Sequence, residues 1–171
     1  MLFEKPSHNT AKDAAKLVST LKANGLYNRV IVGMHDSVHP SRAKLLNAIK
    51  KRKAEVREVN VVFNYPKDPQ DPSSWRLYHP VYGGAQLDLG IYVYKLAKDI
   101  GSKIGFDLKN FHQKGRKITV KRVNPSKVDI DVSARLQYTV DDRKIAVNLD
   151  TAITPGNVPR AEVRVVLANG D

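Results

Sequence analysis

The stretch VDIDVSARLQYTV, residues 128–140, decides the fold of this chain. Every second residue from Val128 to Val140 is apolar, counting Ala134 and Tyr138, and every residue between them is polar or charged. This period of two predicts a β-strand with one buried and one solvent-facing side. The turn sequence Asp141-Asp142-Arg143 follows, and the same alternation returns in residues 144–150 and 161–167. The sequence therefore predicts a C-terminal antiparallel β-meander.

Two further elements precede this meander. The segment KITVKRV, residues 117–123, predicts a short strand that Asn124-Pro125 ends. Residues 85–104 predict the strongest helix of the chain, which Gly105 terminates. Its apolar residues recur at intervals of three and four, namely Leu89, Tyr92, Val93, Leu96, Ile100 and Ile104.

The N-terminal part predicts a helix-strand-helix-strand unit. Thr10 and Asp13 form a capping-box pattern at the start of the first helix, which Asn24-Gly25 ends. A short buried strand is expected at residues 27–32, a second helix at 40–54 and a second strand at 56–63. This order with short connections favours parallel pairing of the two strands.

These elements place the chain in the α+β class. The segment NYPKDPQDPSSW, residues 64–75, holds three prolines and predicts a loop. We therefore expect one domain, 1–171, with two lobes. The expected parts are an α/β unit at 1–64, a Pro-rich linking loop at 65–74, and a helix plus antiparallel meander at 75–171.

Composition narrows the function classes. The chain of 171 residues has no cysteine, which excludes disulfides, thiol catalysis and thiolate metal sites. No apolar run approaches the roughly 18 residues of a membrane span, and the first residues lack the pattern of a signal peptide. We therefore expect a cytoplasmic protein, or a virion protein if the source is a phage, with no membrane contact.

The segment VIVGMHDSVHPSR, residues 30–42, raises the question of a metal site. His35, Asp36 and His39 resemble the zinc motif H-E-x-x-H, which requires both histidines on one helical face. Pro40 disfavours a helical conformation of His39 and suits the first helical position. We therefore interpret this segment as a helix start capped by His39 or Ser37. A metal-dependent hydrolase or phosphoesterase using the three residues remains an alternative.

No set of nucleophile, base and orienting group is recognisable elsewhere. The sequence contains no G-x-S-x-G, G-x-G-x-x-G or Walker-type loop. Gly83-Gly84 precedes a helix whose first amides could hold an anion, although a flexible helix entry is the simpler interpretation. We therefore expect a protein that is not an enzyme and has no cofactor or metal.

Positive charge is the other prominent feature, with 29 Lys and Arg against 17 Asp and Glu and a net charge of +12. Such an excess favours contact with nucleic acid or an acidic partner, in the first case with salt-dependent binding. The candidate contact residues fall in two stretches: Arg42, Lys44, Lys50, Lys51, Arg52, Lys53 and Arg57, and then Lys114, Arg116, Lys117, Lys121 and Arg122.

The helix DLGIYVYKLAKDIGSKIGF leading into KGRKITVKRV, followed by the hairpin around DDR, resembles small α+β proteins of tailed-phage virions. The resembling proteins are of the tail terminator, neck and connector type, and the likeness covers about residues 85–168. It implies a non-enzymatic assembly subunit that forms a homo-oligomer or ring within a larger complex. The alternative is a general nucleic-acid-binding protein that uses the basic helix 42–57.

Overall fold

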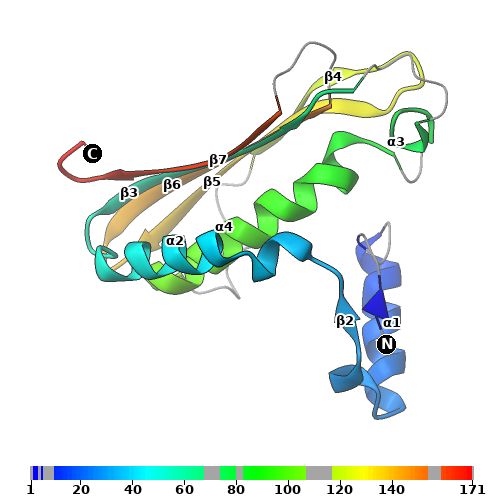
Figure 1. The fold of residues 1–171 in the computed structure, drawn as a ribbon, viewed down its shortest axis with the longest axis horizontal. Coiled ribbons are helices and arrows are strands. Elements are labelled where there is room, and N and C mark those ends of the chain that lie inside the picture. The colour runs from blue at the N-terminus through cyan, green and yellow to red at the C-terminus, as the bar shows by residue number, and fades with distance from the viewer. Residues whose placement is uncertain are drawn as a thin grey trace.

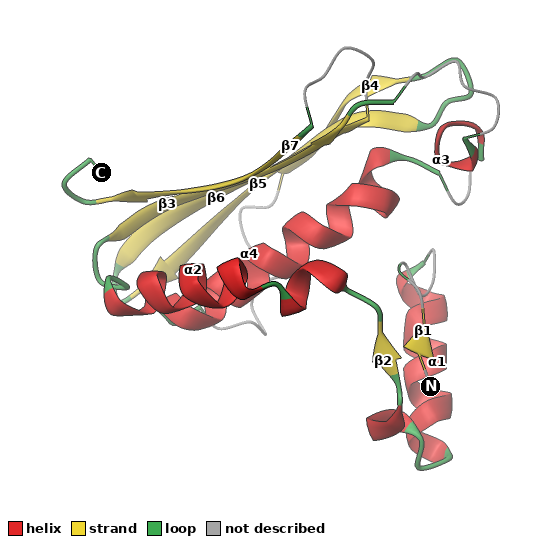
Figure 2. Cartoon of the chain, viewed as in Figure 1, coloured by secondary structure: helices red, strands yellow, loops and turns green. Residues whose placement is uncertain are grey.

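The computed structural model describes residues 2–3, 5, 10–67, 74–79, 83–106, 117–153 and 159–170. It confirms the α+β class, with helices packed on one face of a mixed sheet (Figures 1 and 2). Its helices are α1 (Ala11–Ala23), α2 (Pro40–Lys51), α3 (Trp75–Tyr78) and α4 (Ile91–Ile104). Its strands are β1 (Leu2–Phe3), β2 (Ile31–Val32), β3 (Val56–Tyr65), β4 (Lys117–Val123), β5 (Asp129–Val140), β6 (Arg143–Ile153) and β7 (Arg160–Leu167).

The β5–β6 hairpin is present as predicted. The two strands pair antiparallel, and Val140 lies opposite Arg143 at the closed end. The two residues between them, Asp141 and Asp142, have φ angles of 47° and 63°. Positive φ at both central residues is the geometry that matches the twist of a tight hairpin, and aspartate tolerates it better than most residues.

The predicted pairing of residues 27–32 with 56–63 is wrong. The five-stranded sheet has the order β4-β5-β6-β3-β7, so β3 lies parallel to β6 and antiparallel to β7. Residues 27–29 form a 3₁₀ turn, and only Ile31 and Val32 extend to pair with β1. Pairing with the two exposed residues of β2 would give β3 few hydrogen bonds and little apolar contact. Pairing with β6 and β7 gives it long hydrogen-bonded ladders and a shared apolar face.

The core lies between this sheet and the helices α2 and α4. Val59 of β3 and Ile145 of β6 are fully buried, as is Ile100 of α4. They belong to one apolar cluster that runs under both helices. The opposite face of the sheet carries mainly polar and small side chains. The apolar residues that alternate along β5 and β6 therefore mark the face that the helices cover.

The strands β1 and β2 pair parallel and, with α1, form a small N-terminal unit that projects away from the sheet and from α2 and α4 (Figure 1). Thr10 caps α1 as predicted, since its hydroxyl accepts a hydrogen bond from the amide of Asp13. The only buried residue of α1 is Leu21. The division into two lobes stays a prediction, and residues 68–73 of the proposed linking loop lie outside the described residues. None of the helices in the described ranges is long and apolar enough to cross a membrane.

Candidate functional site

A largely buried ion pair joins the N-terminal unit to the start of α4. The ammonium of Lys5 lies 2.7 Å from the carboxylate Oδ1 of Asp88 and donates a second hydrogen bond of 2.7 Å to the Asp88 carbonyl oxygen. The side chains are 13% and 8% exposed. Charged side chains are seldom this buried unless they are paired or functional. Lys5 follows β1 almost directly, so the pair sits where the two parts of the molecule meet.

Asp88 owes its position to an irregular helix start. Residues Gln86–Gly90 form a π-helical turn that continues into α4, and such turns occur frequently at functional sites. The second carboxylate oxygen of Asp88 accepts a hydrogen bond of 2.7 Å from Nε of Arg76. Each oxygen of this carboxylate therefore faces one cation, and the side chain is fixed from both sides.

The Gly83-Gly84 pair is held at this helix entry by backbone hydrogen bonds. The amides of Gly83 and Gly84 each donate at 2.7 Å, to the carbonyls of His79 and Arg76. The amide of Gln86 donates to Asp129, whose pKa is raised by burial against the opposing effect of backbone hydrogen bonds. These amides are engaged within the fold, so the interpretation as an anion site lacks support.

A side chain at Gly84 would be strained. The φ of Gly84 is +107°, which side-chain-bearing residues rarely adopt, and a Cβ there would collide with the Asp129 carboxylate.

The aromatic ring of Tyr92 contacts the Lys5 ammonium. The Lys5 ammonium lies 4.6 Å from the centroid of the Tyr92 ring, a cation–π geometry. Tyr92 follows Asp88 by four residues and so lies on the same side of the helix. The ring packs edge-on against Phe63 of β3, with centroids 5.5 Å apart and planes at 75°. The lysine is therefore held between a carboxylate and an aromatic face.

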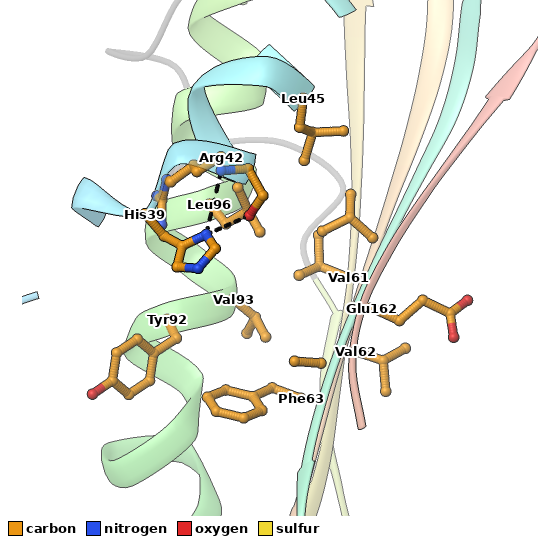
Figure 3. Close-up of a pocket in the computed structure, with 13 residues that line it drawn as sticks. His39, Arg42, Leu45, Val61, Val62, Phe63, Tyr92, Val93, Leu96 and Glu162 are labelled. Carbon is orange, nitrogen blue, oxygen red and sulfur yellow. Dashed lines mark hydrogen bonds between the residues drawn. The ribbon is translucent and has the colours of Figure 1, made fainter. Parts of the chain in front are cut away.

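A cavity of about 530 Å³ adjoins this cluster between α2, α4 and the β3–β7 edge of the sheet (Figure 3). Tyr92 and Phe63 lie at one end, and His39 and Arg42 lie at the other. Its lining residues are His39, Ser41, Arg42, Leu45, Val61, Val62, Phe63, Tyr92, Val93, Leu96, Ala161, Glu162 and Val163.

The histidine segment begins a helix, as predicted. His39 is the N-cap of α2: its Nδ1 accepts from the Ser41 amide at 3.3 Å and lies 2.6 Å from the Ser41 hydroxyl. His35 and Asp36 belong to a 3₁₀ turn, and their side chains are outside the described structure. Within the described residues, no group of three or more His, Asp or Glu side chains could hold a metal ion.

Arg42, one of the predicted contact residues, is buried and serves the packing of α2 on α4. Its Nη2 lies 2.7 Å from the Asp99 carboxylate, and Lys95 donates to the same group at 2.7 Å. Burial alone would raise the pKa of Asp99, but the hydrogen bonds from Lys95 and Arg42 outweigh it and lower that pKa. Arg42 therefore contributes to the fold rather than to a basic surface.

The other predicted contact residues do not form one patch, because α2 and β4 lie at different ends of the sheet (Figure 1). Several engage local partners: Arg52 pairs with Glu55 at 2.6 Å, and Lys121 pairs with Asp150 at 2.7 Å. Their contact with a partner stays a prediction. Exposed positions are Lys44, Lys50, Lys51, Lys53, Arg57 and Lys117, and Arg122 pairs with Asp131, whereas Lys114 and Arg116 lie outside the described residues.

Lys5, Asp88 and Arg76 were missed by the sequence interpretation. One signal was available: Asp88 occupies the apolar side of the predicted helix, one turn before Tyr92. An ionisable residue on such a side is usually paired with an opposite charge or functional. No pattern marked Lys5, because its partner is 83 positions away.

No protein-family model and no curated protein matches this chain. Solved structures share its fold. KijD10, a 3-ketoreductase from Actinomadura kijaniata in complex with NADP and TDP-benzene, is 19% identical with a TM-score of 0.70 over 96% of this chain and 46% of its own. An NAD-binding oxidoreductase from Klebsiella pneumoniae is 18% identical with a TM-score of 0.67, and the match covers 96% of this chain and 44% of that protein.

The WlbA dehydrogenase from Thermus thermophilus, in complex with NAD and alpha-ketoglutarate, is 18% identical with a TM-score of 0.57 over 99% of this chain and 50% of its own. The chain thus spans 44–50% of the length of these three structures. At this level of identity, the likeness establishes the fold.

These matches correct the expected resemblance. The likeness to tailed-phage virion proteins is wrong, because the structures that share the fold are NAD(P)-binding dehydrogenases and reductases. With it fall the expectation of a non-enzymatic virion subunit and its two alternatives, a nucleic-acid-binding protein and a metal-dependent hydrolase. A helix on an antiparallel hairpin is common to many folds, and the sequence interpretation lacked the strand order that separates them.

Proposed function

We propose that this chain carries the substrate side of the active site of an NAD(P)-dependent dehydrogenase or reductase that acts on a sugar-like hydroxyl or carbonyl group. The observation that carries the proposal is the Lys5 ammonium, held against Asp88 and the Tyr92 ring beside a cavity of about 530 Å³. The names of the fold relatives, among them KijD10 and a D-galactose-1-dehydrogenase from Rhizobium etli, support it.

Lys5 would handle the proton of this reaction. In the reductive direction a hydride reaches the carbonyl carbon, and the Lys5 ammonium gives one proton to the carbonyl oxygen, which becomes a hydroxyl. In the oxidative direction the neutral amine takes the hydroxyl proton as the hydride leaves. A positioned side chain that transfers a proton accelerates such a step by roughly 10²–10⁴-fold. Asp88 and Arg76 would keep the amine in place.

The surroundings of Lys5 fit a nicotinamide cofactor. Lys5 follows the carboxyl end of β1, a strand of the parallel pair β1–β2, and ligands of open α/β sheets gather at the carboxyl ends of parallel strands. Bound there, the cofactor would supply or accept the hydride. The sequence holds no G-x-G-x-x-G, so the phosphates would be bound by a separate α/β unit.

The exposed side of the N-terminal unit supports the presence of such a cofactor-binding unit. Ile31 of β2 is 69% exposed, and Val38 in the turn that follows β2 is 84% exposed, although both are large and apolar. A parallel pair of two-residue strands is far below the size of a stable parallel sheet, which is normally covered on both faces. A nucleotide-binding α/β unit packed against β1 and β2 would complete it and bring the cofactor to Lys5.

The test is cofactor-linked turnover by this chain purified together with the α/β unit that would bind the cofactor. NAD⁺ or NADP⁺ is supplied with a panel of free and derivatised sugars, and reduced cofactor is followed by absorbance. Lys5→Ala is expected to lower turnover by roughly 10²–10⁴-fold. Lys12→Ala, at an exposed lysine of α1, serves as the matched control. Equal turnover of the two variants, or the lack of any turnover with either cofactor, would overturn the proposal.

A further inference from the structure

The cavity beside Lys5 is lined mainly by apolar side chains and by few hydrogen-bonding groups. Most of its lining is aliphatic or aromatic and comes from four elements: Leu45 of α2, Leu96 of α4, Phe63 of β3 and Val163 of β7, with their neighbours. At about 530 Å³ the cavity has the size of small-molecule sites, which span roughly 300–1,000 Å³. A sugar ring with its hydroxyl groups would find few partners on these walls.

The charged residues at the cavity do not change this character. The Arg42 guanidinium is engaged by Asp99 at 2.7 Å. Glu162 extends away from the helices in Figure 3, on the far side of the sheet. His39 uses Nδ1 to cap α2. A diphosphate placed against the remaining walls would lose its hydration without a compensating cation, which is strongly unfavourable.

Tyr92 connects the cavity to the reacting group. Its ring lines the cavity and also lies 4.6 Å below the Lys5 ammonium. A molecule seated in the cavity would therefore lie beside the residue whose ring contacts the Lys5 ammonium.

We infer that the substrate carries an apolar group, aliphatic or aromatic, that fills this cavity while its reacting hydroxyl or carbonyl meets Lys5. This inference rests on the proposed function and names the substrate class: a sugar-like compound with an apolar substituent, rather than a free sugar or a sugar nucleotide held by its phosphates.

The test compares binding of methyl and octyl β-glucoside by calorimetry, the octyl compound being kept below its micelle concentration. Each methylene that enters the cavity contributes about 0.8 kcal/mol, roughly a fourfold gain in affinity. If three or four enter, octyl glucoside binds about 100-fold more tightly than methyl glucoside. Equal affinities would overturn the inference.

Two variants locate the binding. Val163→Asp places a carboxylate in the cavity wall, whereas Val166→Asp places it on the opposite face of the same strand, since Val166 lies opposite Glu58 and Val163 opposite Val61. The first is expected to reduce the octyl preference below about tenfold, and the second to preserve it. Leu45→Ser repeats the test from α2, and circular dichroism verifies that each variant is folded. An octyl preference unaffected by Val163→Asp and Leu45→Ser would contradict the inference.

Turnover separates this inference from the function beneath it. If octyl glucoside binds in the cavity but no variant or substrate gives cofactor-linked turnover, the proposed function fails and the apolar site stands. If Lys5→Ala abolishes turnover while the alkyl chain adds no affinity, the function stands and the inference fails.

Discussion

The five-stranded sheet region and the β1–α1–β2 unit differ in how completely each buries its own apolar residues. In the sheet region, Val59 and Ile145 have no exposed surface, and α2 and α4 cover the main apolar cluster of the sheet. In the N-terminal unit, Ile31 and Val32 of β2 are 69% and 38% exposed. The sheet region therefore has a core of its own, whereas the unit that holds Lys5 has an apolar surface left to cover.

This difference explains why the candidate site lies where it does. Asp88 and Tyr92 belong to the sheet region, where hydrogen bonds hold the α4 entry. Lys5 belongs to the incomplete unit and meets them across the junction. A site built in this way gains its geometry from the sheet region and its access to a second ligand from the uncovered side.

The largest expected effect comes from making the same truncation in both regions. Ile145→Ala removes a fully buried side chain and should lower the free energy of unfolding by about 2–5 kcal/mol. Ile31→Ala removes an exposed one and should change it by less than about 0.5 kcal/mol. Urea unfolding followed by circular dichroism measures both. A similar loss for the two variants would mean that β2 is covered in solution.

A second comparison uses two glycines with positive φ. Gly84→Ala should lower the free energy of unfolding by about 2–4 kcal/mol, because the new Cβ meets the Asp129 carboxylate in a strained backbone conformation. Gly25→Ala, with φ of +66° and open space around it, should cost about 1 kcal/mol. Thermal unfolding of both variants checks the order. Equal losses would show that the α4 entry tolerates movement.

A smaller, pH-dependent effect is expected for Asp99, which links α2 to α4. Since the folded-state pKa of Asp99 lies below its ordinary value of 3.8, its ionised form stabilises the fold above that pH. The contribution is lost as the pH falls through the folded-state pKa. Asp99→Asn should therefore lower the free energy of unfolding by about 1–2 kcal/mol at pH 7, a figure reduced because the carboxylate is partly exposed to solvent. In strong acid the same substitution should change the free energy of unfolding little. A cost that persists at low pH would assign the effect to packing instead.

The sequence was sufficient wherever the structure depends on local pattern. The alternation of residues 128–140 predicted β5, the spacing from Leu89 to Ile104 predicted α4, and Pro40 predicted the His39 cap. Each of these elements is specified by neighbours within a few residues, because a periodic apolar face and a capping side chain act over one or two turns.

Features set by long-range pairing were not predictable in this way. The position of β3 between β6 and β7 depends on partners 88 to 111 residues away, and its own sequence suits either neighbour. The Lys5–Asp88 pair likewise forms only when the fold brings a two-residue strand to the start of α4. The expected function was wrong for the same reason, since it was drawn from one helix and one hairpin.

The most direct measurement of the central claim is a double-mutant cycle in cofactor-linked turnover with Lys5→Ala, Asp88→Asn and the combined variant. If Asp88 acts by holding the Lys5 amine, each single change should cost roughly 10²–10⁴-fold and the double variant should be no slower than the worse single one. Losses that multiply in the double variant would contradict a site in which the two residues act as one unit.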